Sequence, residues 1–292
     1  MVQSEIKTDK KEQEYADAKL RRLQLVQLEM LKVLDEICKR NDIHYQLFAG
    51  TALGAVRHRG FIPWDDDIDL GMPREDYERF LEVAPAALGE RFCVTCSRTN
   101  PRQAALFAKV MLTGTRFVTD ETEEAGFDQG VFVDIFPYDA VCAESNAAKR
   151  QRKRCMMWQS ISYLYHSKHI VVPHKGAMGT IEAIVCRVAH YAVRALFSPE
   201  RINRGFDKVA MIAKDDSRSD MLMASSYAAT EPFRKSMLLP PSVICFEGKE
   251  FFAPADVEGY LHTQYGQTWN QLPPEDQRRN HAPKELYLGK DL

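Results

Sequence analysis

Four aspartates lie within five consecutive positions: Asp65, Asp66, Asp67 and Asp69. Apolar residues flank them on both sides, so a solvated loop would leave large hydrophobic side chains in water. Carboxylates this close raise one another's pKa unless a cation compensates their charge. Carboxylate oxygens are also the ligands that hard divalent cations prefer in proteins. The stretch therefore predicts a metal site.

The spacing of these aspartates separates two kinds of metal site. In an extended strand, side chains two positions apart share a face, so Asp67 and Asp69 are expected side by side. A calcium loop that starts at Asp65 would need glycine at its sixth position and glutamate at its twelfth. The chain has Leu70 and Asp76 there, which argues against such a loop.

A lone aspartate, Asp134, lies in an apolar run over residues 131–136, which we expect to form a strand that Pro137 ends. A buried carboxylate is costly unless it is hydrogen-bonded, paired or bound to metal. One interpretation is a carboxylate held by the backbone or by a basic partner. The other is a third ligand beside Asp67 and Asp69, because three such carboxylates can hold two Mg²⁺ ions around a phosphoryl group, with Mn²⁺ as the alternative ion.

Gly50 and Thr51 open an expected helix over residues 52–59. Glycine permits close backbone approach, and threonine is a suitable N-cap residue. The start of a helix offers free N–H groups to an anion such as phosphate, although an ordinary cap explains the pair equally well. Three further cations are candidates to hold phosphate oxygens: Arg57, Lys109 and His281. For Lys109, a lysine at the edge of a sheet is the alternative.

The composition of the 292 residues is that of a soluble globular protein, with a net charge of −2 that gives no overall attraction to nucleic acid. The seven cysteines are irregularly spaced, so a disulfide framework is not expected and a reducing cytosol fits better. The polar N-terminus does not resemble a signal peptide, and no apolar run is long enough for a transmembrane helix.

Hydrophobic periodicity predicts an α/β chain of the α+β type. We expect helices over 14–40, 73–88, 200–222 and 255–265, and strands over 43–49, 92–95, 104–112 and 115–119. A mobile acidic loop is expected over 120–130, a β-hairpin over 243–252, and a tail that folds back on the core. The expected division is a disordered tail over 1–12, a catalytic core over 13–140, a helical insertion over 145–205 and a C-terminal part over 206–292.

The insertion begins with the basic run KRQRKR at residues 149–154 and continues with apolar and aromatic helical stretches. Buried core helices are one interpretation. The other is peripheral membrane contact through residues 149–197, because basic residues beside an apolar helix favour a bilayer surface.

Four segments together resemble the LicD family, the bacterial relatives of fukutin and fukutin-related protein. They are AGTALGAVRHRGFIPWDDDIDLGMPREDYERF, LFAKVMLTGTRFV, GVFVDIFPYD and FEGKEFFAPADVEGYLHTQYGQTWNQLPPEDQRRNHAP. The resemblance implies a nucleotidyltransferase-like core with a mixed β-sheet flanked by helices. It also implies that Gly50 and Thr51 form the helix start, and that Asp67, Asp69 and Asp134 form the carboxylate set.

The resemblance further implies a phosphotransferase that moves phosphocholine from CDP-choline to a hydroxyl of a cell-surface glycan and releases CMP. The expected acceptor is a lipid-linked precursor of teichoic acid or lipopolysaccharide type, and the expected location is the cytoplasm or the inner face of the cell membrane. Asp65 or Asp66 is expected to act as a base or to position a ligand. Candidate aromatic residues around choline are Trp64, Tyr77, Tyr138 and Trp269.

Two alternatives stay open. The first is the same chemistry with CDP-ribitol or CDP-glycerol as donor. The second is a non-catalytic, metal-dependent membrane scaffold, which would bind a bilayer without turning over a donor.

Overall fold

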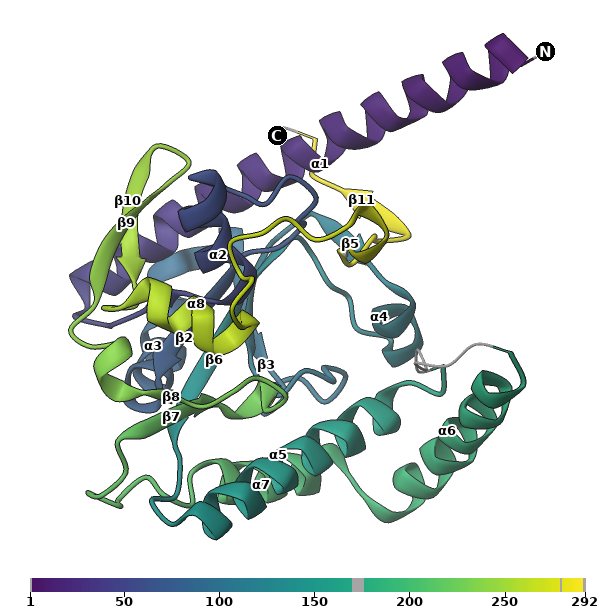
Figure 1. Cartoon of the computed structure of the whole chain (residues 1–292). Coiled ribbons are helices and arrows are strands. Elements are labelled where there is room, and N and C mark those ends of the chain that lie inside the picture. Colours follow the sequence, from purple (N-terminus) through teal and green to yellow (C-terminus); the bar gives the residue numbers. More distant parts are fainter. Residues whose placement is uncertain (1, 170–175, 279, 291–292) are drawn as a thin grey trace.

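A mixed sheet of seven strands is the centre of the fold (Figure 1). The computed structural model describes residues 2–169, 176–278 and 280–290. The strand order is β1-β2-β6-β4-β3, and β7 and β8 extend the sheet beside the far end of β6. The strands are β1 (Gln46–Leu47), β2 (Asp69–Pro73), β3 (Phe92–Cys96), β4 (Ala108–Leu112), β6 (Phe132–Ala140), β7 (Met221–Ala224) and β8 (Phe233–Arg234).

Only β2 and β6 run parallel among the paired strands of this sheet in the described residues, and the other pairs are antiparallel. Two small sheets lie beside it: the predicted hairpin of β9 (Ser242–Phe246) and β10 (Lys249–Ala253), and the pair of β5 (Arg116–Val118) with β11 (Glu285–Tyr287). The helices are α1 (Val2–Arg40), α2 (Ala49–His58), α3 (Arg74–Leu88), α4 (Asp120–Ala125), α5 (Ser145–His166), α6 (Gly176–Leu196), α7 (Pro199–Ala210) and α8 (Val257–Tyr265). The mixed sheet with flanking helices confirms the predicted α+β class.

The main hydrophobic core lies between the sheet and helices α1 and α3, which both contact β6. Leu34 of α1, Phe80 of α3 and Ile68 are all fully buried there. Ile68 alternates with Asp67 and Asp69, so the strand that contributes to this core carries its aspartates on the other side. Burial of one face of β2 thereby determines where its carboxylates point.

Several element boundaries differ from the predicted ones. Strand β6 continues past Pro137, because its neighbouring strand changes there from β4 to β7. The last residue pair between β6 and β4 is Ile135 with Ala108, and the first between β6 and β7 is Tyr138 with Ala224. A residue without an N–H is tolerated where no ladder bond needs one. The expected helix over 200–222 ends at Ala210, and residues 221–224 instead form β7, which completes the sheet.

The N-terminal and acidic segments also differ. The segment expected as a mobile loop over 120–130 contains α4, whose N-cap residue Thr119 exchanges hydrogen bonds with Thr122 in a capping box. Helix α1 begins at Val2, inside the segment expected as a disordered tail, which agrees with the helix propensity of its Glu, Lys and Gln residues. Strand β5 pairs with β11 from the C-terminal tail and not with β4, so the tail does fold back.

Helices α5 and α7 pack together on a second, smaller core that includes Cys155, Ile202 and Phe206. Helix α6 lies at the outer end of this group, beside α5 (Figure 1). Within the described residues, no helix combines the length and the apolar character that crossing a bilayer requires. The division of the chain at residues 140 and 205 stays a prediction.

Candidate active site

The aspartates of β2 and β6 meet at one end of the parallel strand pair. Asp69 is the register partner of Asp134, and Asp67 lies two residues before Asp69, just ahead of the strand. Asp65, Asp67, Asp69 and Asp134 all line one cavity of about 680 Å³. The predicted convergence of Asp67, Asp69 and Asp134 is therefore present in the structure, while their role as metal ligands stays a prediction.

Burial and mutual repulsion raise the pKa values of these carboxyl groups. Burial, then the charges of Asp67 and Asp66, raise the pKa of Asp65 to about 8. Burial and the charges of Asp134 and Asp66 raise the pKa of Asp67 to about 6, although His281 opposes this shift. The pKa values of Asp69 and Asp134 are raised as well, first by burial. A cluster of carboxyls in this condition gains stability from a nearby cation.

Lys109 supplies part of that compensation. It is the register partner of Asp134 on β4, and its Nζ lies 2.7 Å from Oδ1 and 3.0 Å from Oδ2 of that carboxylate. The ammonium group also lies 3.8 Å from the centre of the Phe132 ring, a favourable cation–π position. Asp134 thus has a basic partner, which was one of the two interpretations that the sequence allowed. Lys109 is directed at this carboxylate and does not point outward at the edge of the sheet.

Gly50 and Thr51 play different parts from the predicted ones. Helix α2 begins at Ala49, and its N-cap residue is Phe48, so the N-cap assignment of Thr51 is wrong. The Thr51 hydroxyl instead accepts a hydrogen bond of 2.9 Å from the backbone N–H of Asp69, which ties the helix to the start of β2.

Gly50 lines the acidic cavity in the first turn of α2. A Cβ atom at this position would lie 2.9 Å from Oδ2 of Asp65, closer than such atoms approach in proteins, so glycine is what allows Asp65 to lie against the helix start. The first N–H groups of a helix have no partner within the helix. The cavity therefore has both carboxylates and a helix N-terminus in its wall.

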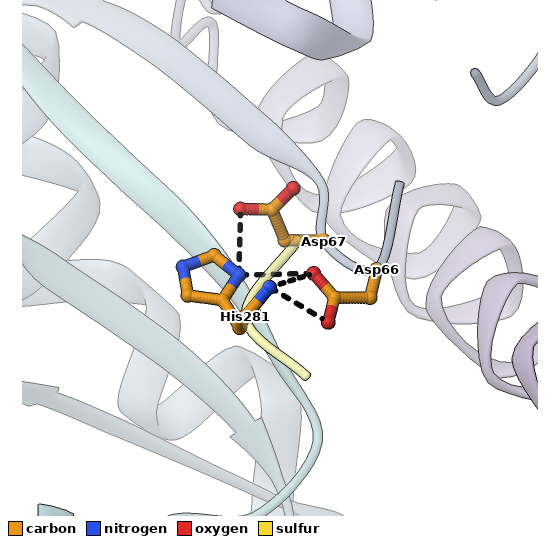
Figure 2. Close-up of side chains that lie close together, drawn as sticks. All are labelled: Asp66, Asp67 and His281. Carbon is orange, nitrogen blue, oxygen red and sulfur yellow. Dashed lines mark hydrogen bonds and ion pairs between the residues drawn. The ribbon is translucent and has the colours of Figure 1, made fainter. Parts of the chain in front are cut away.

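Asp66 does not line this cavity and instead holds the C-terminal tail at His281, beside Asp67 (Figure 2). Its side chain is almost fully buried and accepts hydrogen bonds from the backbone N–H groups of His281, at 3.0 Å, and Ala282, at 3.1 Å. The His281 ring Nδ1 lies 3.0 Å from Asp66 and 3.6 Å from Asp67. Burial lowers the pKa of His281, but the hydrogen bond that its ring donates to Asp66 and the charge of Asp67 outweigh this effect and raise the pKa to about 9.

The remaining predicted cation, Arg57, does not line the acidic cavity. Its guanidinium donates hydrogen bonds to the backbone carbonyls of Gln271, at 2.9 Å, and Trp269, at 3.4 Å. It thereby holds the tail after α8 against α2. Of the three predicted phosphate-binding cations, only His281 lines the cavity, with Lys109 directly behind Asp134.

The aromatic residues around the cavity are not the predicted ones. Tyr77 and Tyr138 are buried in the main core. The guanidinium carbon of Arg278 lies over the Trp64 ring, 4.5 Å from the ring centre. Like these three, Trp269 is absent from the cavity wall. The wall instead contains seven rings, those of Phe48, Phe107, Phe136, Tyr163, Tyr227, Tyr260 and Tyr265.

Part of this aromatic wall could have been found from the sequence. Phe136 lies two positions after Asp134 and Phe107 two positions before Lys109, so each shares a strand face with a charged residue of the site. These two rings lie 4.2 Å apart, and Tyr227 lies 6.4 Å from Phe136. The tyrosines come from α5, from the turn after β7 and from α8, and no local pattern marks them.

The donor set of the cavity fits a hard divalent cation. Four carboxylate groups with raised pKa values share one cavity, and carboxylate oxygen is the ligand type that Mg²⁺ and Mn²⁺ prefer. Within the described residues, the group with its ligand atoms closest together is Asp66, Asp67 and His281, all within 4.8 Å. Because both Asp66 oxygens already accept backbone hydrogen bonds, Oδ1 from His281 and Oδ2 from Ala282, we favour Asp67 with Asp69 and Asp134.

Comparisons with known proteins agree with this geometry. Residues 42–177 match the family described as LicD/FKTN/FKRP, nucleotidyltransferase domain. The chain is 29% identical over 281 residues to the lipopolysaccharide cholinephosphotransferase LicD of Haemophilus influenzae. The aligned region covers 92% of this chain and 98% of that protein. Uncharacterised proteins of Rickettsia typhi and Rickettsia prowazekii are 40% and 38% identical over 78 residues, or 25% and 29% of their own lengths.

The family match spans the helix start at Gly50, the aspartates of β2 and β6, and Lys109. The likeness to the Haemophilus protein covers 92% of the chain and thus extends well beyond that domain. Residues 42–177 therefore resemble the nucleotidyltransferase domain of the LicD/FKTN/FKRP family.

Proposed function

We propose that this protein transfers phosphocholine from CDP-choline to a hydroxyl of a lipopolysaccharide-type glycan and releases CMP. The observation that carries the proposal is the composition of one cavity, where four carboxylates and a helix start lie next to seven aromatic rings. A nucleoside diphosphate needs the first two features, and a quaternary ammonium group needs the third. The likeness to the Haemophilus lipopolysaccharide cholinephosphotransferase supports the same assignment.

The donor diphosphate lies between Gly50 and the carboxylates in this proposal. Asp67, Asp69 and Asp134 would hold Mg²⁺, or Mn²⁺ in its place, which neutralises charge on the diphosphate when bound. The first-turn N–H groups of α2 point their dipoles at the same phosphates. Lys109 lies 2.7 Å from Asp134 and opposes the rise that burial causes in the pKa of this carboxyl, so it favours the ionised form that binds a cation.

The choline group lies against the aromatic wall. The Phe136 and Tyr227 ring centres lie 6.4 Å apart. Both rings line the cavity together with Tyr265 of α8. A cation over aromatic faces is stabilised by their quadrupoles, most strongly where water is excluded. A neutral alcohol in the same position would lack this attraction, which favours choline over ribitol or glycerol.

The acceptor hydroxyl oxygen attacks the phosphorus atom that carries choline. A new oxygen–phosphorus bond forms as the bond to CMP breaks, and the hydroxyl proton passes to a carboxylate. Asp65 is our candidate for this base, because it lines the cavity beside Gly50 and burial raises its pKa, which makes its carboxylate form a stronger proton acceptor than an exposed one. Asp66 is excluded from this role, since it is committed to the tail.

Release of CMP from CDP-choline, with a divalent cation and a lipopolysaccharide-type acceptor, tests the proposal. Asp67→Asn and Asp134→Asn should each reduce the rate by at least about a hundredfold, whereas Asp128→Asn, on the exposed loop before β6, should not change it. CDP-ribitol and CDP-glycerol in parallel reactions decide the donor. Wild-type rates in both cavity variants would refute the site, and binding without turnover of any donor would favour a scaffold.

A further inference from the structure

Helix α6 presents an apolar face to solvent along its described length. The side chains of Ile181, Val185 and Val188 are 59%, 60% and 65% exposed. Their spacing of three and four positions places them in one stripe on the helix. Further exposed apolar residues of α6 join this stripe: Met178, Ile184, Tyr191 and Leu196.

The opposite side of α6 is attached to the protein, so the orientation of the stripe is determined by packing. The ring Nδ1 of the buried His190 lies 2.7 Å from the backbone carbonyl oxygen of Leu164 in α5. Cys186, one turn earlier, shares a small cavity with Leu164. The apolar stripe therefore faces away from α5. Helix α6 itself lies at the outer end of the molecule (Figure 1).

The surroundings of the stripe are basic. Arg187 and Arg194 lie seven positions apart and form an exposed row along one edge of α6. Residues 145–205 contain eleven lysines and arginines against two glutamates, although the whole chain has a net charge of −2. Positive charge is thus concentrated on the part of the chain that carries the exposed apolar face.

We propose that α6 lies in the surface of an anionic lipid bilayer, with its apolar stripe among the acyl chains and its arginines at the headgroups. An apolar stripe with a basic edge is the pattern of an interfacial helix. A symmetric antiparallel contact between two copies of α6 would bring their arginine rows together on one side, and repulsion would oppose it. The sequence predicted membrane contact through residues 149–197 as a whole. Within that range the exposed apolar stripe lies on α6, and Arg152 of the basic run is paired with Glu231.

This orientation also brings the acidic cavity near the bilayer. Tyr163 lines both that cavity and the smaller cavity of about 390 Å³ that Cys186 of α6 helps to form. Tyr163 of α5 therefore borders both the acidic cavity and the space between α5 and α6. If the proposed function holds, this arrangement suits an acceptor glycan anchored in the same bilayer, but membrane binding itself does not depend on that function.

Flotation of the full chain with phosphatidylcholine vesicles, with and without phosphatidylglycerol, tests the proposal. We compare the wild type with Ile181→Asp/Val188→Asp and with the control Val243→Asp/Leu272→Asp, which changes two exposed apolar residues outside α6. We expect the α6 variant to lose at least about tenfold in bound fraction. Arg187→Gln/Arg194→Gln should weaken binding to the anionic vesicles by about tenfold to thirtyfold.

Light scattering of the same proteins without lipid gives the oligomeric state. Binding of the wild type and the control, with loss in the α6 variant, supports the proposal. Absence of wild-type flotation overturns it, as does equal flotation of the wild type and the α6 variant. A dimer that Ile181→Asp/Val188→Asp dissociates, without vesicle binding, overturns it in favour of a second copy. Far-UV circular dichroism should be the same for all variants, because every altered side chain is exposed.

Discussion

The buried carboxylate of Asp66 accepts the backbone N–H of His281 and lies 3.0 Å from the Nδ1 atom of its ring. One aspartate of the acidic stretch is thereby used to hold a residue 215 positions later in the chain. His281 in turn lies 3.6 Å from Asp67. The C-terminal tail is thus part of the cavity wall, and a change at Asp66 should affect both the tail and the site.

We predict that Asp66→Ala lowers the free energy of unfolding by about 2 kcal/mol, because it leaves the partly buried N–H groups of His281 and Ala282 and the ring of His281 without their acceptor. Urea unfolding followed by circular dichroism measures the change. Asp276→Ala, at an exposed position of the same tail, is the matched control and should change stability by less than about 0.5 kcal/mol. Equal effects of the two substitutions would contradict the role of Asp66.

The carboxylate cluster predicts how stability depends on pH without added metal. Burial first, and then neighbouring charges, raise the pKa of Asp65 to about 8 and that of Asp67 to about 6. Groups with a raised pKa keep protons in the folded state that the unfolded chain has already released. Stability should therefore fall as pH rises from about 4 to about 8.

Asp65→Asn should remove part of this fall and stabilise the metal-free protein at pH 8 by an amount on the order of 1 kcal/mol. Thermal unfolding across this range measures the effect. Added Mg²⁺ should raise the melting temperature of the wild type at pH 8 and have less effect on Asp67→Asn. A metal-free protein that becomes more stable between pH 5 and pH 8 would be inconsistent with a repulsive cluster.

Lys109 and Asp134 should show strong energetic coupling, since both are almost fully buried and lie 2.7 Å apart. We predict that Lys109→Met lowers the free energy of unfolding by about 3 kcal/mol, because it leaves a buried charge unpaired. The double variant Lys109→Met/Asp134→Asn should be more stable than Lys109→Met alone. A double-mutant cycle in urea measures the coupling, and additive effects would mean that the pair is not coupled.

Tyr227 should contribute to the choice of donor. Tyr227→Leu keeps an apolar side chain but removes the aromatic face, and we expect the KM for CDP-choline to rise by about threefold to thirtyfold. The KM for CDP-glycerol, which has no quaternary ammonium group, should stay the same. Tyr287→Leu, on the exposed strand β11, is the control. Equal changes of KM for both donors would argue against a cation-binding role.

The sequence by itself determined the local part of the site. Alternation along a strand places Asp67 and Asp69 on one side, with Ile68 buried on the other, and it places Phe136 on the side of Asp134. Which side chains share a side depends only on the alternation of neighbouring residues, and every extended strand has this alternation. The helix start at Gly50 has the same local origin, although its N-cap residue is Phe48.

Only the tertiary structure decided what lies around that local part. It directs Asp66 to His281 and Arg57 to the carbonyls of the tail, and it brings Tyr163, Tyr227 and Tyr265 from three separate elements to one cavity. These contacts join residues far apart in the chain, and their pairing depends on how the insertion and the tail pack against the sheet. Periodicity reports which face of an element is buried, but not which distant segment covers it.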